Sequence, residues 1–285
     1  MPTSKRERQR DNRTKKRAEQ QKLERHRKLR KRAIRVTVLA LLVAGALILP
    51  AILGNRDDAT TTTTSAITTT TSAPPTTLDP AALPFDYQGY RAQPTACDAE
   101  PPPPVMEMTF SAPEDQGIAP NATVTATITT SCGTIVAQLD PLLAPETVNS
   151  FVFLAREGYF DGSAFHRILP GFVIQGGDPT AVGNGGPGYL VPDEFPEAGF
   201  TYGRGVLAMA NGGANSTGSQ FFIVAGEDAR LGNTYSAFGN VVASDETLDR
   251  ITSVARTGRD GTADTEQSLP LETVYIDSVI IEVSS

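Results

Sequence analysis

The pattern of apolar and polar residues becomes strand-like in the second half of the chain. Val124, Ala126 and Ile128 alternate with threonines, as expected for a strand with one buried face. Residues 131–133 then read as a turn, and residues 134–139 continue the strand pattern. The alternation therefore predicts an antiparallel hairpin at the start of a folded domain.

Two segments of this domain have helical spacing, and several short apolar runs are separated by glycines. One predicted helix begins at Pro145 and ends at Gly158, and the other covers residues 246–255. The remaining predicted strands are residues 165–169, 172–175, 206–210, 221–225, 237–242 and 274–283. Many short strands with only two helices predict a mostly β fold, a closed antiparallel β-barrel capped by two α-helices.

Before this domain, residues 36–55 form an uncharged run of mainly Val, Leu, Ala and Ile. A helix of about 20 residues rises roughly 30 Å and spans the hydrocarbon core of a bilayer. The sixteen Lys and Arg residues of positions 1–35 all precede this run. The positive-inside bias therefore predicts a single-pass cell-membrane protein, with a cytoplasmic N-terminus and an extracytoplasmic C-terminal domain.

Two other interpretations of the apolar run remain open. A cleaved signal peptide would need an unusually long n-region of residues 1–35, and its apolar run would exceed the usual length. No clear cleavage site with small residues follows Leu53. The third interpretation is a buried helix of a soluble domain.

The net charge of −7 is an average over two oppositely charged parts. Residues 1–35 hold sixteen basic and four acidic residues, whereas the rest of the chain holds nine basic and 28 acidic residues. The basic part is predicted to be a solvated cytoplasmic tail attracted to anionic lipid headgroups. Nucleic-acid binding by the tail is an open alternative, although it lacks aromatic residues for stacking. The acidic part repels phosphate backbones, so no nucleic-acid partner is expected for it.

Residues 56–104 are predicted to form a disordered extracytoplasmic linker. Threonine dominates residues 59–77, and Pro101 to Pro104 add a stiff element. Such a segment has little to bury against the entropy of ordering. A glycosylated stalk and a bare tether both fit this composition. The folded domain is then assigned to residues 105–285, with its core at 118–283.

The two cysteines, Cys97 and Cys132, both fall on the predicted outer side. In an oxidising compartment they form a candidate disulfide between the segment before the domain and its first hairpin. Two unpaired thiols are the alternative. Two cysteines alone do not make a metal site, so no metal is predicted.

Four segments of the folded domain, in this order, resemble the motifs of the cyclophilin-type peptidyl-prolyl cis–trans isomerases. Any one of them alone would be a weak signal, but four in family order are a strong one. They are residues 165–178 (FHRILPGFVIQGGD), 205–211 (GVLAMAN), 215–223 (NSTGSQFFI) and 231–239, which contains Leu231 and the run YSAFG. The resemblance extends over residues 118–283.

The resemblance implies an eight-stranded barrel with two capping helices and a substrate groove on its outer face. It implies action on proline-containing polypeptides, without a cofactor, and it places Arg167 at the family's catalytic position. His166 is expected to face the opposite side of the strand in a structural role. The implied substrate-binding residues are Phe172, Val173, Gln175, Ala210, Asn211, Gln220, Phe222, Leu231 and Tyr235.

An arginine at that position suits the chemistry of X–Pro isomerisation. The bond rotates slowly, with a barrier near ~18–20 kcal/mol, because resonance gives C–N partial double-bond character. A catalyst must favour the twisted state, in which the prolyl nitrogen regains a lone pair. A permanently charged, rigid guanidinium can donate to that nitrogen or to a nearby carbonyl oxygen.

The chain departs from the drug-sensitive members of the family at the rim of the groove. Arg230 stands where cyclosporin-sensitive members have tryptophan, and Val173 stands where methionine is common. Tyr235 occupies a position that is histidine in many eukaryotic members. We expect weakened cyclosporin binding and an intact proline pocket.

The sequence as a whole predicts a monomeric, membrane-tethered isomerase that assists the folding of exported proteins. Two alternatives remain open. One is a binding module that holds proline-containing segments of envelope proteins, with incidental turnover. The other is a structural protein of the wall or membrane, in which the threonine-rich stalk is the essential part.

Overall fold

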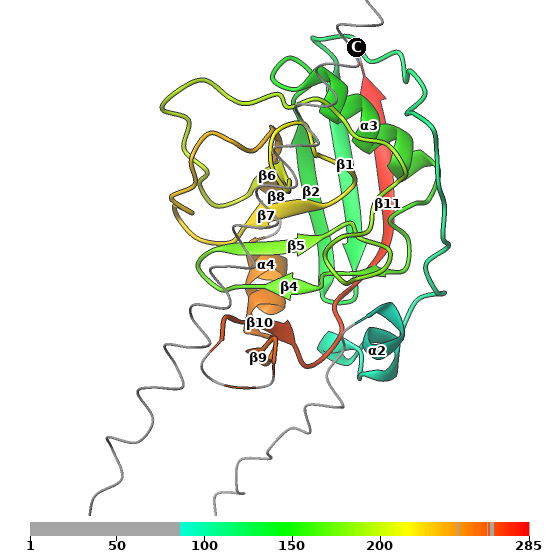
Figure 1. Cartoon of the computed structure of the whole chain (residues 1–285), viewed down its shortest axis with the longest axis vertical. Helices are drawn as coiled ribbons and strands as arrows, with labels where there is room; N and C mark the ends of the chain where they lie inside the picture. Colours follow the sequence, from blue (N-terminus) through cyan, green and yellow to red (C-terminus); the bar gives the residue numbers. More distant parts are fainter. Residues whose placement is uncertain (1–85, 244, 261, 263–264, 285) are drawn as a thin grey trace, which may run out of the picture. The chain divides into compact units, whose positions relative to one another are not determined.

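The computed structural model describes residues 86–285 except 244, 261, 263–264 and 285. In this part the chain is mostly β, as predicted, with three α-helices and one short 3-10 turn (Figure 1). The helical segments are α2 (Tyr87–Ala92), η3 (Ala96–Asp98), α3 (Pro145–Arg156) and α4 (Asp245–Ser253). The strands are β1 (Thr123–Thr130), β2 (Gly133–Leu139), β3 (Ser163–Ala164), β4 (Arg167–Ile168), β5 (Val173–Gly176), β6 (Val206–Met209), β7 (Phe221–Val224), β8 (Ala237–Ala243), β9 (Arg256–Gly258), β10 (Gln267–Pro270) and β11 (Tyr275–Ser284).

Nine of these strands form one curled antiparallel sheet, in the order β3-β11-β1-β2-β8-β6-β7-β5-β4. The prediction of a closed eight-stranded barrel is not confirmed, because the terminal strands β3 and β4 do not pair. These strands are two residues long and follow each other in the sequence. The ends of the sheet are therefore joined by the chain through Phe165 and His166 instead of by a hydrogen-bonded ladder. Strands β9 and β10 form a separate hairpin.

The predicted first hairpin is confirmed. Strands β1 and β2 pair from Val124 opposite Leu139 to Thr130 opposite Gly133. Val124, Ala126 and Ile128 of β1 are buried, and the threonines between them are more exposed, as the alternation predicted. Gly133 closes the turn at φ 130°, a conformation that favours glycine. The two predicted helices are also confirmed as α3 and α4, with shifts of a few residues at their ends.

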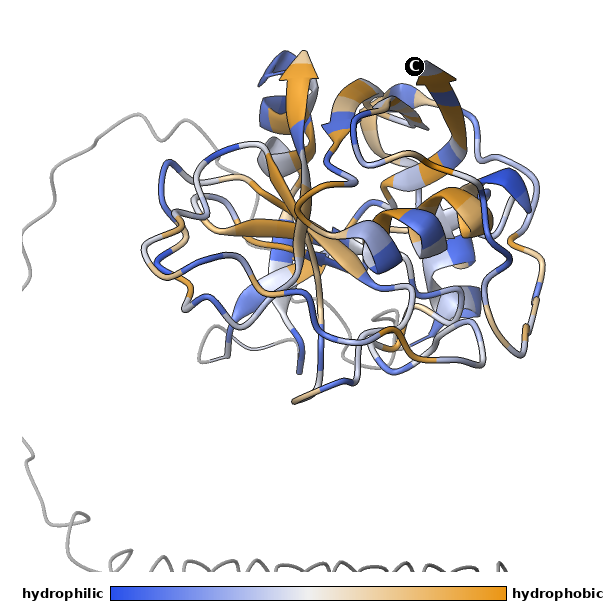
Figure 2. Ribbon diagram, turned by 90° about the horizontal axis from the view of Figure 1, so that it is seen from above, coloured by the Kyte–Doolittle hydropathy of each residue, from blue (hydrophilic) through white to orange (hydrophobic). Residues whose placement is uncertain are grey.

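An aromatic cluster fills the core between α3 and the sheet. Phe151 on α3 stacks on Phe160 at 5.0 Å between ring centroids and meets Phe221 of β7 edge-on at 5.5 Å. Phe238 of β8 lies 5.1 Å from the Phe151 ring. Figure 2 shows the apolar colouring concentrated in the central strands. This packing fixes the strands that carry the functional residues.

Residues 86–104, which the sequence assigned to the linker, pack on the domain. Helix α2 is capped at its N-terminus by Asp86, whose side chain accepts a hydrogen bond from the Gly89 N–H. Tyr87 and Tyr90 are three positions apart, and both are buried. The Tyr87 hydroxyl donates to the Gly162 carbonyl and the Tyr90 hydroxyl to the His166 carbonyl. This segment therefore supports the chain directly before Arg167.

The disulfide between Cys97 and Cys132 is confirmed, and it holds this N-terminal segment on the turn between β1 and β2. The basic tail, the apolar run at 36–55 and the threonine-rich stretch lie outside the described residues. Within the described part of the chain, no helix has both the length and the apolar character needed to cross a membrane.

Candidate active site

Arg167 lies on the end strand β4, directly opposite Gln175 of β5. Its Nη1 donates to Gln175 Oε1 at 3.3 Å, and its guanidinium carbon sits 5.5 Å from the centroid of the Phe172 ring. Phe172 precedes β5, so the strand pairing brings all three predicted site residues together. The guanidinium is held by an aromatic face and an amide, which restricts its orientation.

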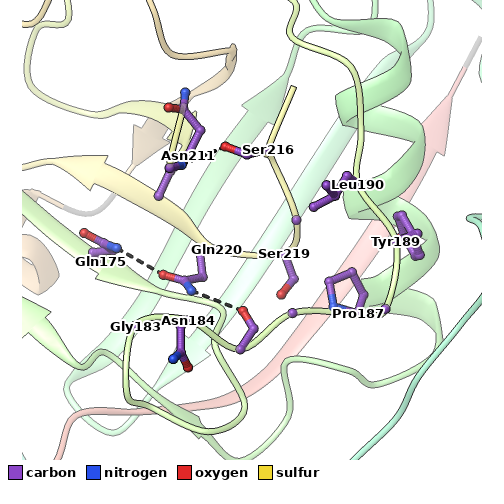
Figure 3. Close-up of a pocket in the computed structure, with 16 residues that line it drawn as sticks. Gln175, Gly183, Asn184, Pro187, Tyr189, Leu190, Asn211, Ser216, Ser219 and Gln220 are labelled. Atoms are coloured by element: carbon purple, nitrogen blue, oxygen red, sulfur yellow. Dashed lines mark hydrogen bonds between the residues drawn. The ribbon is translucent and has the colours of Figure 1, made fainter. Parts of the chain in front are cut away.

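Two glutamines, Gln175 and Gln220, form a chain of hydrogen bonds that leads from Arg167 to a neighbouring loop (Figure 3). Gln175 Nε2 donates to Gln220 Oε1 at 3.2 Å, and Gln220 Nε2 donates to the Gly185 carbonyl at 3.1 Å. Because each amide both donates and accepts, the chain of bonds fixes the orientation of both side chains. The orientation of Gln175 towards Arg167 is therefore set by contacts reaching the loop around residue 185.

The predicted apolar slot forms one cluster on the sheet. Val173 and Phe222 are 2% and 4% exposed, and they pack with Tyr202, Ala208 and Ala237. The partly buried members of the cluster include four more of the predicted substrate-binding residues, Phe172, Ala210, Leu231 and Tyr235. The structure thus brings together the apolar residues Phe172, Val173, Phe222 and Leu231, to which the family resemblance gives the proline ring.

Tyr235 forms one wall of this cluster. Its ring meets Phe222 edge-on, with the centroids 5.5 Å apart and an interplanar angle of 84°. The Tyr202 ring meets Tyr235 edge-on with the centroids 6.3 Å apart, and the Tyr202 hydroxyl donates to the Tyr235 carbonyl at 2.6 Å. These contacts hold the Tyr235 ring in place beside the slot.

A pocket of about 570 Å³ adjoins the predicted site. Four predicted residues line it, Gln175, Ala210, Asn211 and Gln220. Figure 3 shows Gln175, Asn211 and Gln220 on one side of the hollow and Pro187, Tyr189 and Leu190 on the other. The wall formed by residues 183–190 was not predicted from the sequence.

Asp178 shapes that loop. Its carboxylate accepts hydrogen bonds from Thr180 and from the backbone N–H groups of Gly183 and Gly185. Burial would raise the pKa of Asp178, but the hydrogen bonds from Thr180 and Gly185 outweigh burial and hold it below its usual value. The ionised carboxylate therefore anchors the loop that borders the pocket.

His166, which directly precedes β4, is buried, as its expected structural role requires. Burial is the main cause that lowers the pKa of His166 to about 4, while the nearby Asp178 charge opposes it. The imidazole is therefore neutral at pH 7 and does not serve the site as a cation.

The neutral state of His166 makes stability depend on pH. The unfolded chain takes up the proton near pH 6.5, but the folded chain takes it up only near pH 4. The free energy of unfolding is thus expected to fall as the pH drops from about 6.5 to about 4. Urea unfolding at a series of pH values measures this. In His166→Phe this part of the pH dependence should disappear, and an unchanged slope in that variant would contradict the assignment.

One contact of the site, between Glu266 and Arg167, was not predicted from the sequence. Glu266 directly precedes β10, and its carboxylate forms two hydrogen bonds to Arg167. Residues 259–266 have no apolar alternation and lie outside the matched motifs, so the sequence held no signal for this contact. Arg230, the position of the family tryptophan, is exposed with φ 51°.

Comparisons with known proteins agree with this geometry. The family model described as "Cyclophilin type peptidyl-prolyl cis-trans isomerase/CLD" matches residues 125–280. Peptidyl-prolyl cis-trans isomerase A of Mycobacterium tuberculosis is 39% identical over 179 residues, covering 57% of this chain and 94% of the relative. Peptidyl-prolyl cis-trans isomerase B of Streptomyces anulatus is 40% identical over 175 residues, covering 55% and 95%.

A solved structure supports the fold independently. The crystal structure of a Cryptosporidium parvum cyclophilin type peptidyl-prolyl cis-trans isomerase superposes with a TM-score of 0.51 at 29% identity. The superposition covers 57% of this chain and 99% of that one. From the curled sheet, the ordered motifs and these matches, the chain belongs to the cyclophilin-type peptidyl-prolyl cis–trans isomerases.

Proposed function

We propose that this isomerase accelerates the folding of exported proteins on the outer side of a cell membrane. The uncharged run at residues 36–55, preceded by sixteen basic residues, supports a single anchor with this orientation. The Cys97–Cys132 disulfide supports an oxidising compartment for the catalytic domain. Proline-containing polypeptides are the proposed substrates, and the domain is proposed to act as a monomer.

The single observation that carries the site assignment is the position of Arg167 beside the apolar cluster. The guanidinium lies over Phe172, which packs in the same cluster as Val173 and Phe222. A proline ring in that cluster would place its nitrogen and neighbouring carbonyl near a fixed cation. Arg167 is accordingly the proposed catalytic residue.

The proposed mechanism needs neither a covalent step nor a cofactor. The apolar cluster takes the proline ring, and Arg167 donates a hydrogen bond to the prolyl nitrogen or a carbonyl as the bond twists. This interaction strengthens in the twisted state, so it lowers the barrier instead of merely tightening binding. Gln175 orients Arg167 and bonds the peptide backbone, Gln220 holds Gln175, and main-chain groups at Ala210 and Asn211 contact the peptide.

Topology and activity can be tested in the same cells. Protease added to intact spheroplasts should degrade the isomerase domain, whereas a cytoplasmic marker protein should stay intact. Protection of the domain would contradict the outward orientation. Refolding of exported proteins with slow X–Pro steps should be delayed in cells that carry only Arg167→Ala. Normal folding in those cells would favour the alternative of a binding module.

Cyclosporin is expected to bind this chain weakly. The exposed Arg230 supplies neither the large apolar surface nor the N–H donor of an indole. Isothermal titration of the full-length chain should show affinity well below the nanomolar range, and Arg230→Trp should bind more tightly. Nanomolar binding by the unchanged chain would refute this prediction.

A further inference from the structure

Glu266 holds the guanidinium of Arg167 on the edge away from Gln175. Arg167 Nε donates to Glu266 Oε1 at 2.9 Å and Nη2 donates to Oε2 at 2.8 Å. Two parallel charge-assisted bonds of this kind restrict both the position and the plane of the guanidinium. The two residues are 99 positions apart in the sequence, so the contact depends on the tertiary fold.

The remaining donors of Arg167 can be counted. A guanidinium carries five N–H groups, one on Nε and two on each terminal nitrogen. Glu266 takes one from Nε and one from Nη2, and Gln175 takes one from Nη1. One N–H therefore remains on Nη1 and one on Nη2. These are the donors left for a substrate, and their directions are set once the other three are fixed.

The position of Glu266 in the fold and its charge both favour the contact with Arg167. It directly precedes β10, which lies beside β4, the strand that carries Arg167. The hydrogen bonds from Arg167 are the main cause that holds the pKa of Glu266 below its usual value, and the charge of Arg259 lowers it further. The carboxylate is therefore ionised throughout the neutral range.

The ion pair between Glu266 and Arg167 is expected to contribute little to the stability of the fold. The Glu266 side chain is 44% exposed and that of Arg167 22% exposed. Ion pairs with this much solvent access contribute little to folding, because water screens them and both side chains lose freedom. The same ion pair can still have a large effect on the reaction rate if it orients a catalytic group, because small misplacements of reacting groups lower the rate by large factors.

We propose that Glu266 is a positioning residue of this isomerase, which fixes Arg167 so that its two remaining N–H groups point at the substrate. The inference rests on the proposed role of Arg167 as the catalytic residue. Glu266 itself does not touch the substrate and acts only through the guanidinium.

Glu266→Gln tests this with little change in shape. The Gln oxygen can still accept one hydrogen bond, but its NH₂ group faces an N–H of Arg167, so the paired contact is lost. On the full-length chain, kcat/KM for an X–Pro peptide is expected to fall about 3- to 10-fold, with kcat affected more than KM. Glu282→Gln, which removes an exposed carboxylate from β11, is the matched control and should stay at the wild-type rate.

Two further measurements separate positioning from a general structural role. In an Arg167→Lys background, which cannot form the paired contact, Glu266→Gln should cause little additional loss. In NMR spectra the Nε–H signal of Arg167, identified by its absence in Arg167→Lys, should exchange with water faster in Glu266→Gln. The melting temperature should not change.

The outcomes distinguish this inference from the proposed function. If Arg167→Ala is impaired while Glu266→Gln keeps the wild-type rate, the positioning role is refuted and the catalytic assignment survives. If Glu266→Gln is faster than wild type, the carboxylate competes with substrate for Arg167, which also overturns positioning. If Arg167→Ala itself matches wild type, the proposed function fails first.

Discussion

Arg167→Ala is expected to lower kcat/KM for an X–Pro peptide by about 10²- to 10³-fold, the usual cost of removing one donor aimed at a transition state. Alanine removes the group proposed to donate to the twisted amide, but leaves the apolar cluster that takes the proline ring. Most of the loss should therefore appear in kcat, with KM little changed. Peptide isomerisation rates measured on the full-length variant check this result.

Arg204→Ala is a matched control for Arg167→Ala. Both side chains are 22% exposed, and both pair with carboxylates, Arg204 with Asp245 and Asp249. Arg204→Ala should keep the wild-type rate per folded molecule, although it loses comparable surface contacts. Equal losses in the two variants would point to a general disturbance of the domain. A wild-type rate in Arg167→Ala would refute its assigned role.

Removal of the Cys97–Cys132 disulfide is expected to destabilise the domain by about 3–4 kcal/mol. The bond joins residues 35 positions apart, and cross-linking a loop of this length restricts the unfolded chain considerably. Replacing both cysteines with alanine avoids unpaired thiols, and Cys132 is fully buried, so a small residue suits its site. Urea unfolding monitored by circular dichroism measures the difference.

Reduction provides the control for this prediction. A thiol reductant should destabilise the wild-type chain by a similar amount and should leave the double alanine variant unchanged. A difference below about 1 kcal/mol would mean that the contacts of the N-terminal segment, such as those of Tyr87 and Tyr90, hold it without the bond. Because Tyr90 bonds the carbonyl of His166, the loss should also loosen the chain beside Arg167.

Much of the fold could be predicted because its signals are local. The alternation of Val124, Ala126 and Ile128 with threonines predicted the first hairpin, since side chains on a strand alternate between faces. The helical spacing after Pro145 predicted α3 for a similar reason. The ordered motifs predicted which apolar residues would gather around the proline slot, and the structure places them in one cluster.

Other features required the tertiary structure. The sequence favoured a disulfide but left unpaired thiols open, and only the folded chain brings Cys97 beside Cys132. Residues 86–104 resembled a linker because their few apolar groups are scattered, yet Tyr87 and Tyr90 find a surface on the domain. The closed barrel was expected from the number of strands, but closure depends on whether β3 and β4 lie in pairing register, which composition does not encode.

The candidate active site also combines features that the sequence predicts with features that only the tertiary structure shows. By itself, the sequence determined that Arg167 lies in the family's central motif on an acidic domain, because motif and charge are read residue by residue. Only the tertiary structure decided what holds Arg167 in place, since Gln175 reaches it across a strand pair and Glu266 from 99 positions away. Contacts between distant segments arise from the packing of the whole chain, and a polar loop shows no local pattern that would reveal them.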